Sequence, residues 1–190
     1  MKILFSIHAG EYLVGQHIED NCKSLRVWVP SKDTGVDLLI SNADATRSTS
    51  VQVKFSKDYS SASSMEPLKQ KGSLSKTFGW FKIGREALKD SQAKYWVFVL
   101  LGFSTNPDFV IIRPQDLLQK LETLYGPKET FQVYIWVTKP GGSWKVDKCW
   151  EVRGLNQQDR LRIAEGAYEN ASRDLSNHLT WDPILQELQS

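Results

Sequence analysis

The sequence predicts an α/β fold in which helices flank a mixed central sheet, and three observations predict it. Residues 6–23 carry apolar side chains at the three-to-four-residue spacing of an amphipathic helix. Three short strand-like stretches follow, at residues 25–29, 35–40 and 51–55. A continuous apolar run at residues 95–103 suits a strand that is covered on both faces. With a helix expected before that run, the order predicts an αβββαβ core with a mixed sheet.

Further elements are predicted after this core: a strand (108–113), a short helix (115–124), a hairpin (131–138 with 144–152) and a final helix (159–179). Gly126 is placed to close the short helix, and Asn156 can cap the final one. We expect one domain over residues 1–190, with its core at about 6–113 and a peripheral hairpin and helices at 114–190.

The composition is that of an ordinary globular protein. The 190 residues are 41% apolar and 24% charged, and a net charge of +2 is too small to indicate nucleic-acid binding by itself. The two cysteines, Cys22 and Cys149, lack the spacing of a zinc site. Two free thiols are expected, and a disulfide between them stays open. No apolar run approaches about 20 residues, and no secretory signal is present, so we expect a cytoplasmic protein without a membrane segment.

Glu11 falls inside the apolar stripe of the first helix. Its position matches that of Ile7, Val14 and Ile18, which recur at helical spacing on one face. A buried carboxylate is costly unless it is hydrogen-bonded, paired with a cation or bound to a metal. A stripe centred slightly aside, with Glu11 at its edge, is the alternative.

The two central strands carry polar residues that a plain strand would not need. Gln52 and Lys54 alternate with Val51, Val53 and Phe55, so they share one face of their strand. Asp37 opens the preceding strand. In an antiparallel hairpin, paired residue numbers that sum to 91 place Asp37 opposite Lys54; any odd sum puts both on one face, and an even sum separates them. We predict the register that sums to 91.

Basic residues gather after these strands. Residues 56–76 form a long loop rich in serine and lysine, and such loops are usually functional or disordered. Residues 76–92 are predicted to be a helix with a basic outer stripe, which suits phosphate contacts but is also common on any amphipathic helix. The proposed nucleic-acid contacts are Lys57, Lys69, Lys71, Lys76, Lys82, Arg85 and Lys89.

The usual catalytic motifs are absent, so the candidate catalytic residues are the polar residues described above, Glu11, Asp37, Gln52 and Lys54. The histidines lack a nucleophile-elbow motif, neither cysteine has the flanking residues of a nucleophile, and no glycine-rich phosphate loop occurs. Asp37 and Glu11 offer hard oxygen ligands for Mg²⁺, and Gln52 or the neighbouring main chain can add a carbonyl oxygen. Lys54 can offset charge that develops on a phosphate. This set suits metal-assisted attack of water on a phosphodiester.

These residues carry a family resemblance. Over roughly residues 6–113, with "GVDLLI" followed by "VQVKFS", the sequence resembles the PD-(D/E)xK (restriction-endonuclease-like) nuclease superfamily, and its Mrr-like QxK variant most of all. The resemblance implies catalytic roles for Asp37, Lys54 and often Glu11. Gln52 stands where most members have an acidic residue, as in Mrr-like members, and the residues after 113 match nothing in that pattern.

Two functions follow as hypotheses. The first is a Mg²⁺- or Mn²⁺-dependent DNA endonuclease, in which Glu11, Asp37 and Gln52 bind the metal and Lys54 stabilises the transition state. The second is a nuclease-fold module that binds nucleic acid or a protein without cutting. Because two one-site subunits can cut two strands, we expect a homodimer, with the hairpin that carries Trp136, Trp144 and Trp150 as its candidate interface.

Overall fold

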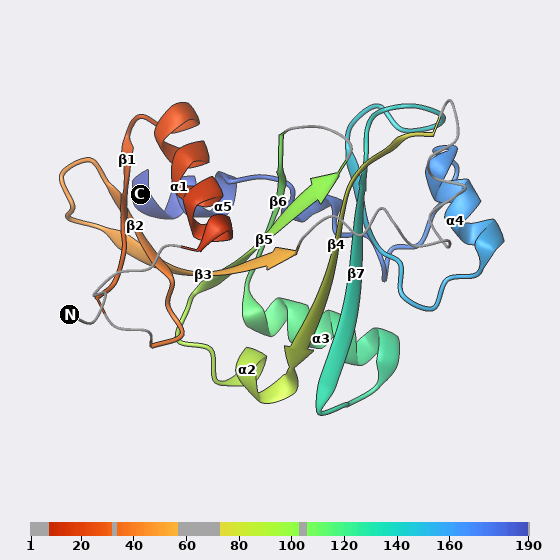
Figure 1. Cartoon of the computed structure of the whole chain (residues 1–190), viewed down its shortest axis with the longest axis horizontal. Helices are drawn as coiled ribbons and strands as arrows, with labels where there is room; N and C mark the ends of the chain where they lie inside the picture. The colour runs from red at the N-terminus through yellow and green to blue at the C-terminus, as the bar shows by residue number, and fades with distance from the viewer. Residues whose placement is uncertain (1–7, 32–33, 57–72, 103–105, 190) are drawn as a thin grey trace.

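The computed structural model is a mixed α/β fold in which helices flank one sheet of eight strands (Figure 1). It describes residues 8–31, 34–56, 73–102 and 106–189. The sheet contains both parallel and antiparallel pairs, so the predicted fold class is confirmed. In the described residues no helix is long and apolar enough to cross a membrane.

The first half of the sheet surrounds strand β5. Its elements are α1 (Ala9–Asn21), β1 (Leu25–Trp28), β2 (Leu38–Asn42), β3 (Ser48–Ser56), β5 (Tyr95–Gly102) and β6 (Asp108–Ile112). Strands β1, β2 and β3 form an antiparallel meander, and β3 runs parallel to β5. Strand β6 pairs antiparallel with β5.

The second half of the sheet is built around a long antiparallel pair. Its elements are β4 (Ser75–Gly84), α2 (Arg85–Lys89), α3 (Pro114–Tyr125), β7 (Thr130–Thr138), β8 (Lys148–Glu151), α4 (Gln157–Ala164), the 3-10 turn η2 (Ser176–His178) and α5 (Asp182–Gln189). Strand β7 pairs with β4 and with β8, so the predicted hairpin is confirmed. The segment expected to be peripheral thus completes the sheet, and α5 returns to pack against β2 and β3.

Strand β5 lies between two hydrophobic cores. Tyr95, Val97 and Val99 point into a core shared with α1 and α5, and the intervening Trp96, Phe98 and Leu100 point into a core shared with α3 and β7. None of these six side chains is more than 2% exposed. Burying one large apolar side chain contributes about 1.5–3 kcal/mol, so the run predicted to be covered on both faces anchors the fold.

The predicted helix over residues 76–92 is wrong in its greater part. Strand β4 occupies Ser75–Gly84, and only five residues, Arg85–Lys89, are helical. Phe78, Phe81 and Ile83 are buried along β4, and the strand pairs with β7 from end to end. Aromatic and β-branched residues fit a pleated surface, and this long-range pairing outweighs the helical spacing of the sequence.

The predicted final helix is also wrong in its length. Asn156 caps α4 by accepting a hydrogen bond from the Asp159 amide at 2.8 Å, as expected, but the helix ends at Ala164. Gly166 has a φ of 75°, and a Cβ there would lie 2.5 Å from the Gly141 carbonyl oxygen. A glycine in the left-handed region commonly ends a helix, and here it also allows the close approach of the β7–β8 turn.

The tryptophans of the β7–β8 hairpin do not form an exposed surface. Trp136, Trp144 and Trp150 are at most 7% exposed, and they pack against Phe78, α4 and Tyr168 within the chain. The candidate dimer interface is therefore wrong, because its apolar side chains are already buried. Dimerisation itself stays a prediction. Both cysteines are free, as expected.

We expect the protein to lose stability as the pH falls below about 6.5, the usual pKa of histidine. Burial lowers the pKa of His178, although a backbone hydrogen bond at Ile111 opposes this effect. The unfolded chain therefore binds a proton before the folded protein does. The stability that His178 contributes is fully present above about pH 6.5. It is lost as the pH falls through the lower pKa that His178 has in the folded protein.

Urea unfolding at about pH 7 and about pH 5.5 measures this loss for the wild type and for His178→Gln. The variant is expected to lose less stability between the two pH values than the wild type does. His8→Gln, which changes an exposed histidine, is the control. An equal loss in the wild type and His178→Gln would rule out His178 as the source.

Candidate functional site

The polar residues of the two central strands meet where β2 separates from β3. Leu38 pairs with Val51 and Leu39 with Ser50, so paired numbers sum to 89. The predicted odd parity is confirmed, but the predicted register is wrong by two residues, and the ladder ends at Leu38, one residue after Asp37. The turn fixes this register, because the Asn42 amide donates to the Arg47 carbonyl at 3.2 Å and the Asn42 side-chain oxygen accepts from the Arg47 amide at 3.0 Å.

Asp37 occupies the point at which the β2–β3 ladder ends. Its amide donates to the Val51 carbonyl at 2.9 Å, and its side-chain Oδ2 accepts from the Val53 amide at 2.7 Å. The carboxylate thus accepts a hydrogen bond from β3 at the point where the β2 main chain no longer pairs with that strand. Gly35, with a φ of 80°, lies just before it, where the chain turns. Oδ1 accepts no hydrogen bond from any described residue, so this oxygen is available to a ligand.

Gln52 and Lys54 lie on the face of β3 that turns away from α1. They pair with Trp96 and Phe98 of β5, and both are half-buried. The Lys54 ammonium lies 4.8 Å from the centre of the Trp96 ring. A cation over an indole face is held by the ring's quadrupole, so Trp96 helps to fix the position of Lys54. The sequence indicated no such role for Trp96, because only the β3–β5 register brings the two together.

Glu11 comes from the helix on the other face of β3. Gly10 packs so closely on this strand that a Cβ would lie 2.7 Å from Phe55 Cβ and 3.1 Å from a Val53 methyl group. Glu11 is only 8% exposed, and its Oε2 accepts from the His8 amide at 3.2 Å. A carboxylate in the first turn also interacts favourably with the helix dipole. Its place in the apolar stripe is therefore confirmed, and helix capping satisfies part of its hydrogen-bonding capacity.

Val53 connects the parts of the candidate site. Its amide holds Asp37, its side chain lies under the residue next to Glu11, and its chain neighbours are Gln52 and Lys54. Asp37, Gln52 and Lys54 therefore lie around one part of β3, whereas Glu11 comes from the helix on the opposite face of this strand.

The candidate site has few oxygen donors for a metal ion, and they suit only an open site. No group of three or more His, Cys, Asp or Glu side chains is arranged to hold a metal in the part of the chain that the structure describes. Mg²⁺ commonly binds through one or two carboxylates, several waters and substrate phosphates, so it does not need an enclosed site. Asp37 and the Gln52 amide oxygen are the donors closest to this description. Glu11, the second predicted carboxylate, comes from the opposite side of β3 and is engaged in capping α1.

The predicted basic stripe does not form. Lys82 lies on β4, whereas Arg85 and Lys89 lie on α2, so the three residues do not line one helix. Arg85 bonds to Glu122 at 2.7 Å, and Lys76 bonds to Asp108 and Asp147 at 2.6 and 2.8 Å. Lys82 and Lys89 are exposed. The other predicted contacts, Lys57, Lys69 and Lys71, lie outside the described residues.

No family model matches the chain, and neither a curated protein nor a solved structure shows significant similarity to it. The function is therefore inferred from the chemistry of the residues themselves.

Proposed function

We propose that the protein is a Mg²⁺- or Mn²⁺-dependent endonuclease that hydrolyses phosphodiester bonds in DNA, with Asp37, Gln52, Lys54 and Glu11 as its site. The observation that carries this proposal is the placement of Asp37. Its carboxylate is fixed at the β2–β3 fork by the Val53 amide, one residue from Lys54 on β3. The resemblance of residues 6–113 to PD-(D/E)xK nucleases supports the same assignment.

Each residue of the site has a distinct part in this chemistry. A divalent ion, when bound, supplies a Lewis acid for the phosphate and lowers the pKa of water. Asp37 presents one oxygen while the Val53 amide holds the other, so the ligand is positioned before substrate arrives. Lys54 places positive charge where negative charge develops on the phosphate oxygens, and Trp96 restricts its movement. Gln52 is neutral, so it can orient a ligand but adds no charge.

Plasmid nicking in the presence of Mg²⁺ or Mn²⁺ tests this function. Lys54→Ala is expected to lower the nicking rate about 10²-fold, because it removes one preorganised charge from the transition state. Lys145→Ala removes an exposed lysine elsewhere and is expected to retain the wild-type rate. If Lys54→Ala and the wild type nick equally, the cleavage comes from a contaminant and the proposed site is not catalytic.

A second candidate is a nuclease-fold module that binds DNA without cutting it. It is favoured by the small number of carboxylates, since Glu11 is engaged in capping α1 and Gln52 is neutral. A gel-shift assay together with a cleavage assay separates the two candidates. A binding module would retard DNA in the gel and would cut no form of DNA or RNA with either metal.

We propose a homodimer for the endonuclease, since two copies could cut two strands, and sedimentation of the protein with duplex DNA tests this stoichiometry.

A further inference from the structure

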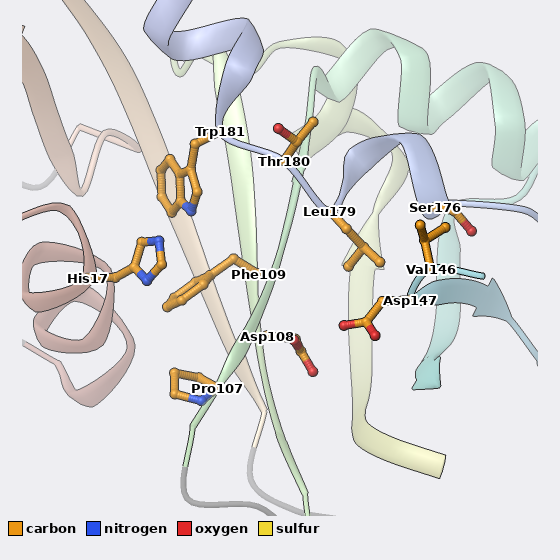
Figure 2. Close-up of a pocket in the computed structure, with 10 residues that line it drawn as sticks. All are labelled: His17, Pro107, Asp108, Phe109, Val146, Asp147, Ser176, Leu179, Thr180 and Trp181. Atoms are coloured by element: carbon orange, nitrogen blue, oxygen red, sulfur yellow. The ribbon is translucent and has the colours of Figure 1, made fainter. Parts of the chain in front are cut away.

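A cavity of about 370 Å³ lies between the two halves of the molecule (Figure 2). His17 of α1, Phe109 of β6 and Trp181, just before α5, line one side of it. Asp108 and Asp147 line the other, and Leu179 lies between the two sides. Sites for small molecules usually combine apolar walls with a few polar groups in a volume of this order. The cavity is separate from the candidate nuclease site, because β6 and β3 flank β5 along the same stretch.

One wall of the cavity is aromatic. The His17 ring lies 4.7 Å from the Phe109 ring and 5.5 Å from the Trp181 ring, and the latter two rings are 5.6 Å apart. Burial lowers the pKa of His17, and Asp20 only partly opposes this effect. The imidazole is therefore neutral at pH 7, and the wall presents three uncharged rings.

The opposite wall is acidic. The Lys76 ammonium donates to Asp108 Oδ1 at 2.6 Å and to Asp147 Oδ2 at 2.8 Å, and the Thr77 hydroxyl donates to Asp108 Oδ2 at 2.6 Å. Burial alone would lower the pKa of Lys76, but these two carboxylates raise it, so the ammonium stays charged. Two carboxylates thus share one cation. Asp147 is 35% exposed, and its Oδ1 accepts no bond from the described residues.

We propose that this cavity binds a small amidinium or guanidinium compound with a planar or apolar body. A planar cation of this kind donates to a carboxylate in a fork and also stacks on aromatic rings, whereas an ammonium is a compact point charge. The cationic end pairs with Asp147, and the body lies against Phe109 and Trp181. A second hollow of about 450 Å³ shares His17 and Pro107 with the cavity and gives room for a longer body toward Asp20.

Calorimetric titration with benzamidine, benzamide and benzoate tests the proposal, because these three probes have similar shape and differ in charge. Benzamidine is expected to bind at least about tenfold more tightly than benzamide, the difference expected for a charge-assisted hydrogen bond. Benzoate is expected not to bind. Asp147→Asn should weaken benzamidine about tenfold and leave benzamide unchanged, since the amide oxygen of the introduced asparagine can still accept from Lys76.

Two further variants keep the test decisive. Asp90→Asn removes a negative charge from an exposed site at the end of α2 and should leave benzamidine binding unchanged. Trp181→Phe keeps an aromatic ring with less stacking surface and should weaken benzamidine and benzamide equally. Equal binding of benzamidine and benzamide to the wild type, no binding of either, or equal benzamidine affinity in the wild type and Asp147→Asn would each overturn the proposal.

Discussion

Replacing Arg173 with alanine is expected to lower the free energy of unfolding by about 3–5 kcal/mol, the usual cost of leaving one partner of a buried ion pair alone. Arg173 Nη1 donates to Glu151 Oε2 at 2.7 Å, and the Glu151 side chain is only 1% exposed. The Tyr125 hydroxyl also bonds to this carboxylate, and the Tyr134 and Arg153 amides donate to it at 3.2 and 3.1 Å. Without Arg173, the buried charge would lose its only ion-pair partner among the described residues.

The loss of unfolding free energy in Arg173→Ala is expected to depend on pH. Burial raises the pKa of Glu151, and removal of Arg173 raises it further. The defect of Arg173→Ala should therefore be largest near pH 7 and should decrease as the pH falls and Glu151 takes up a proton.

Urea unfolding of the wild type and Arg173→Ala at about pH 7 and about pH 5 measures both effects. Arg162→Ala removes an exposed arginine and is expected to change the unfolding free energy by less than about 0.5 kcal/mol. A loss below about 1 kcal/mol in Arg173→Ala would show that this network does not hold the C-terminal segment to the sheet.

Asp37→Asn is expected to lower metal-dependent cleavage about 10³-fold and to weaken Mn²⁺ binding in parallel. The change removes the negative charge that a divalent ion requires, and the Lewis-acid contribution of the ion is worth several kcal/mol. Asn can still accept the Val53 amide through its carbonyl oxygen, so the β2–β3 fork should keep its conformation. A loss of function in this variant would therefore report on charge at the site, not on folding.

Electron paramagnetic resonance of free Mn²⁺ measures binding without relying on cleavage, and unfolding in urea verifies the fold. Asp90→Asn has the same change of charge at an exposed position and should bind Mn²⁺ as the wild type does. If Asp37→Asn binds Mn²⁺ with unchanged affinity, Asp37 is not a metal ligand. In that case the second candidate, a module that binds DNA without cutting it, gains support.

Local patterns were sufficient for much of the first half of the fold. The helix that contains Glu11, the meander of β1, β2 and β3, and the doubly buried β5 all follow from side-chain periodicity in short windows. Parity along the two central strands also placed Asp37, Gln52 and Lys54 in one region. These features depend on neighbours within the same element or within one short turn, so the sequence specifies them directly.

Strand β4 and the register of the β2–β3 pair needed the tertiary structure. Residues 76–84 have helical apolar spacing, but their pairing with β7, about fifty positions further along the chain, makes them a strand. The observed register, closed by the Asn42–Arg47 turn, differs from the predicted one by two residues, and Asp37 lies just outside the ladder, with its amide bonded to Val51. Both results depend on hydrogen bonds whose partners a pattern within one stretch does not identify.

The sequence by itself determined the α/β class, the elements that bear the candidate residues and the face that Gln52 and Lys54 share. Only the tertiary structure decided that the Val53 amide holds Asp37, that Trp96 supports Lys54 and that His17 and Asp147 face one cavity. The physical reason is the range of the interactions. Periodicity reports which side of an element is buried, whereas a site is made by groups from distant elements whose separation is set by packing and register.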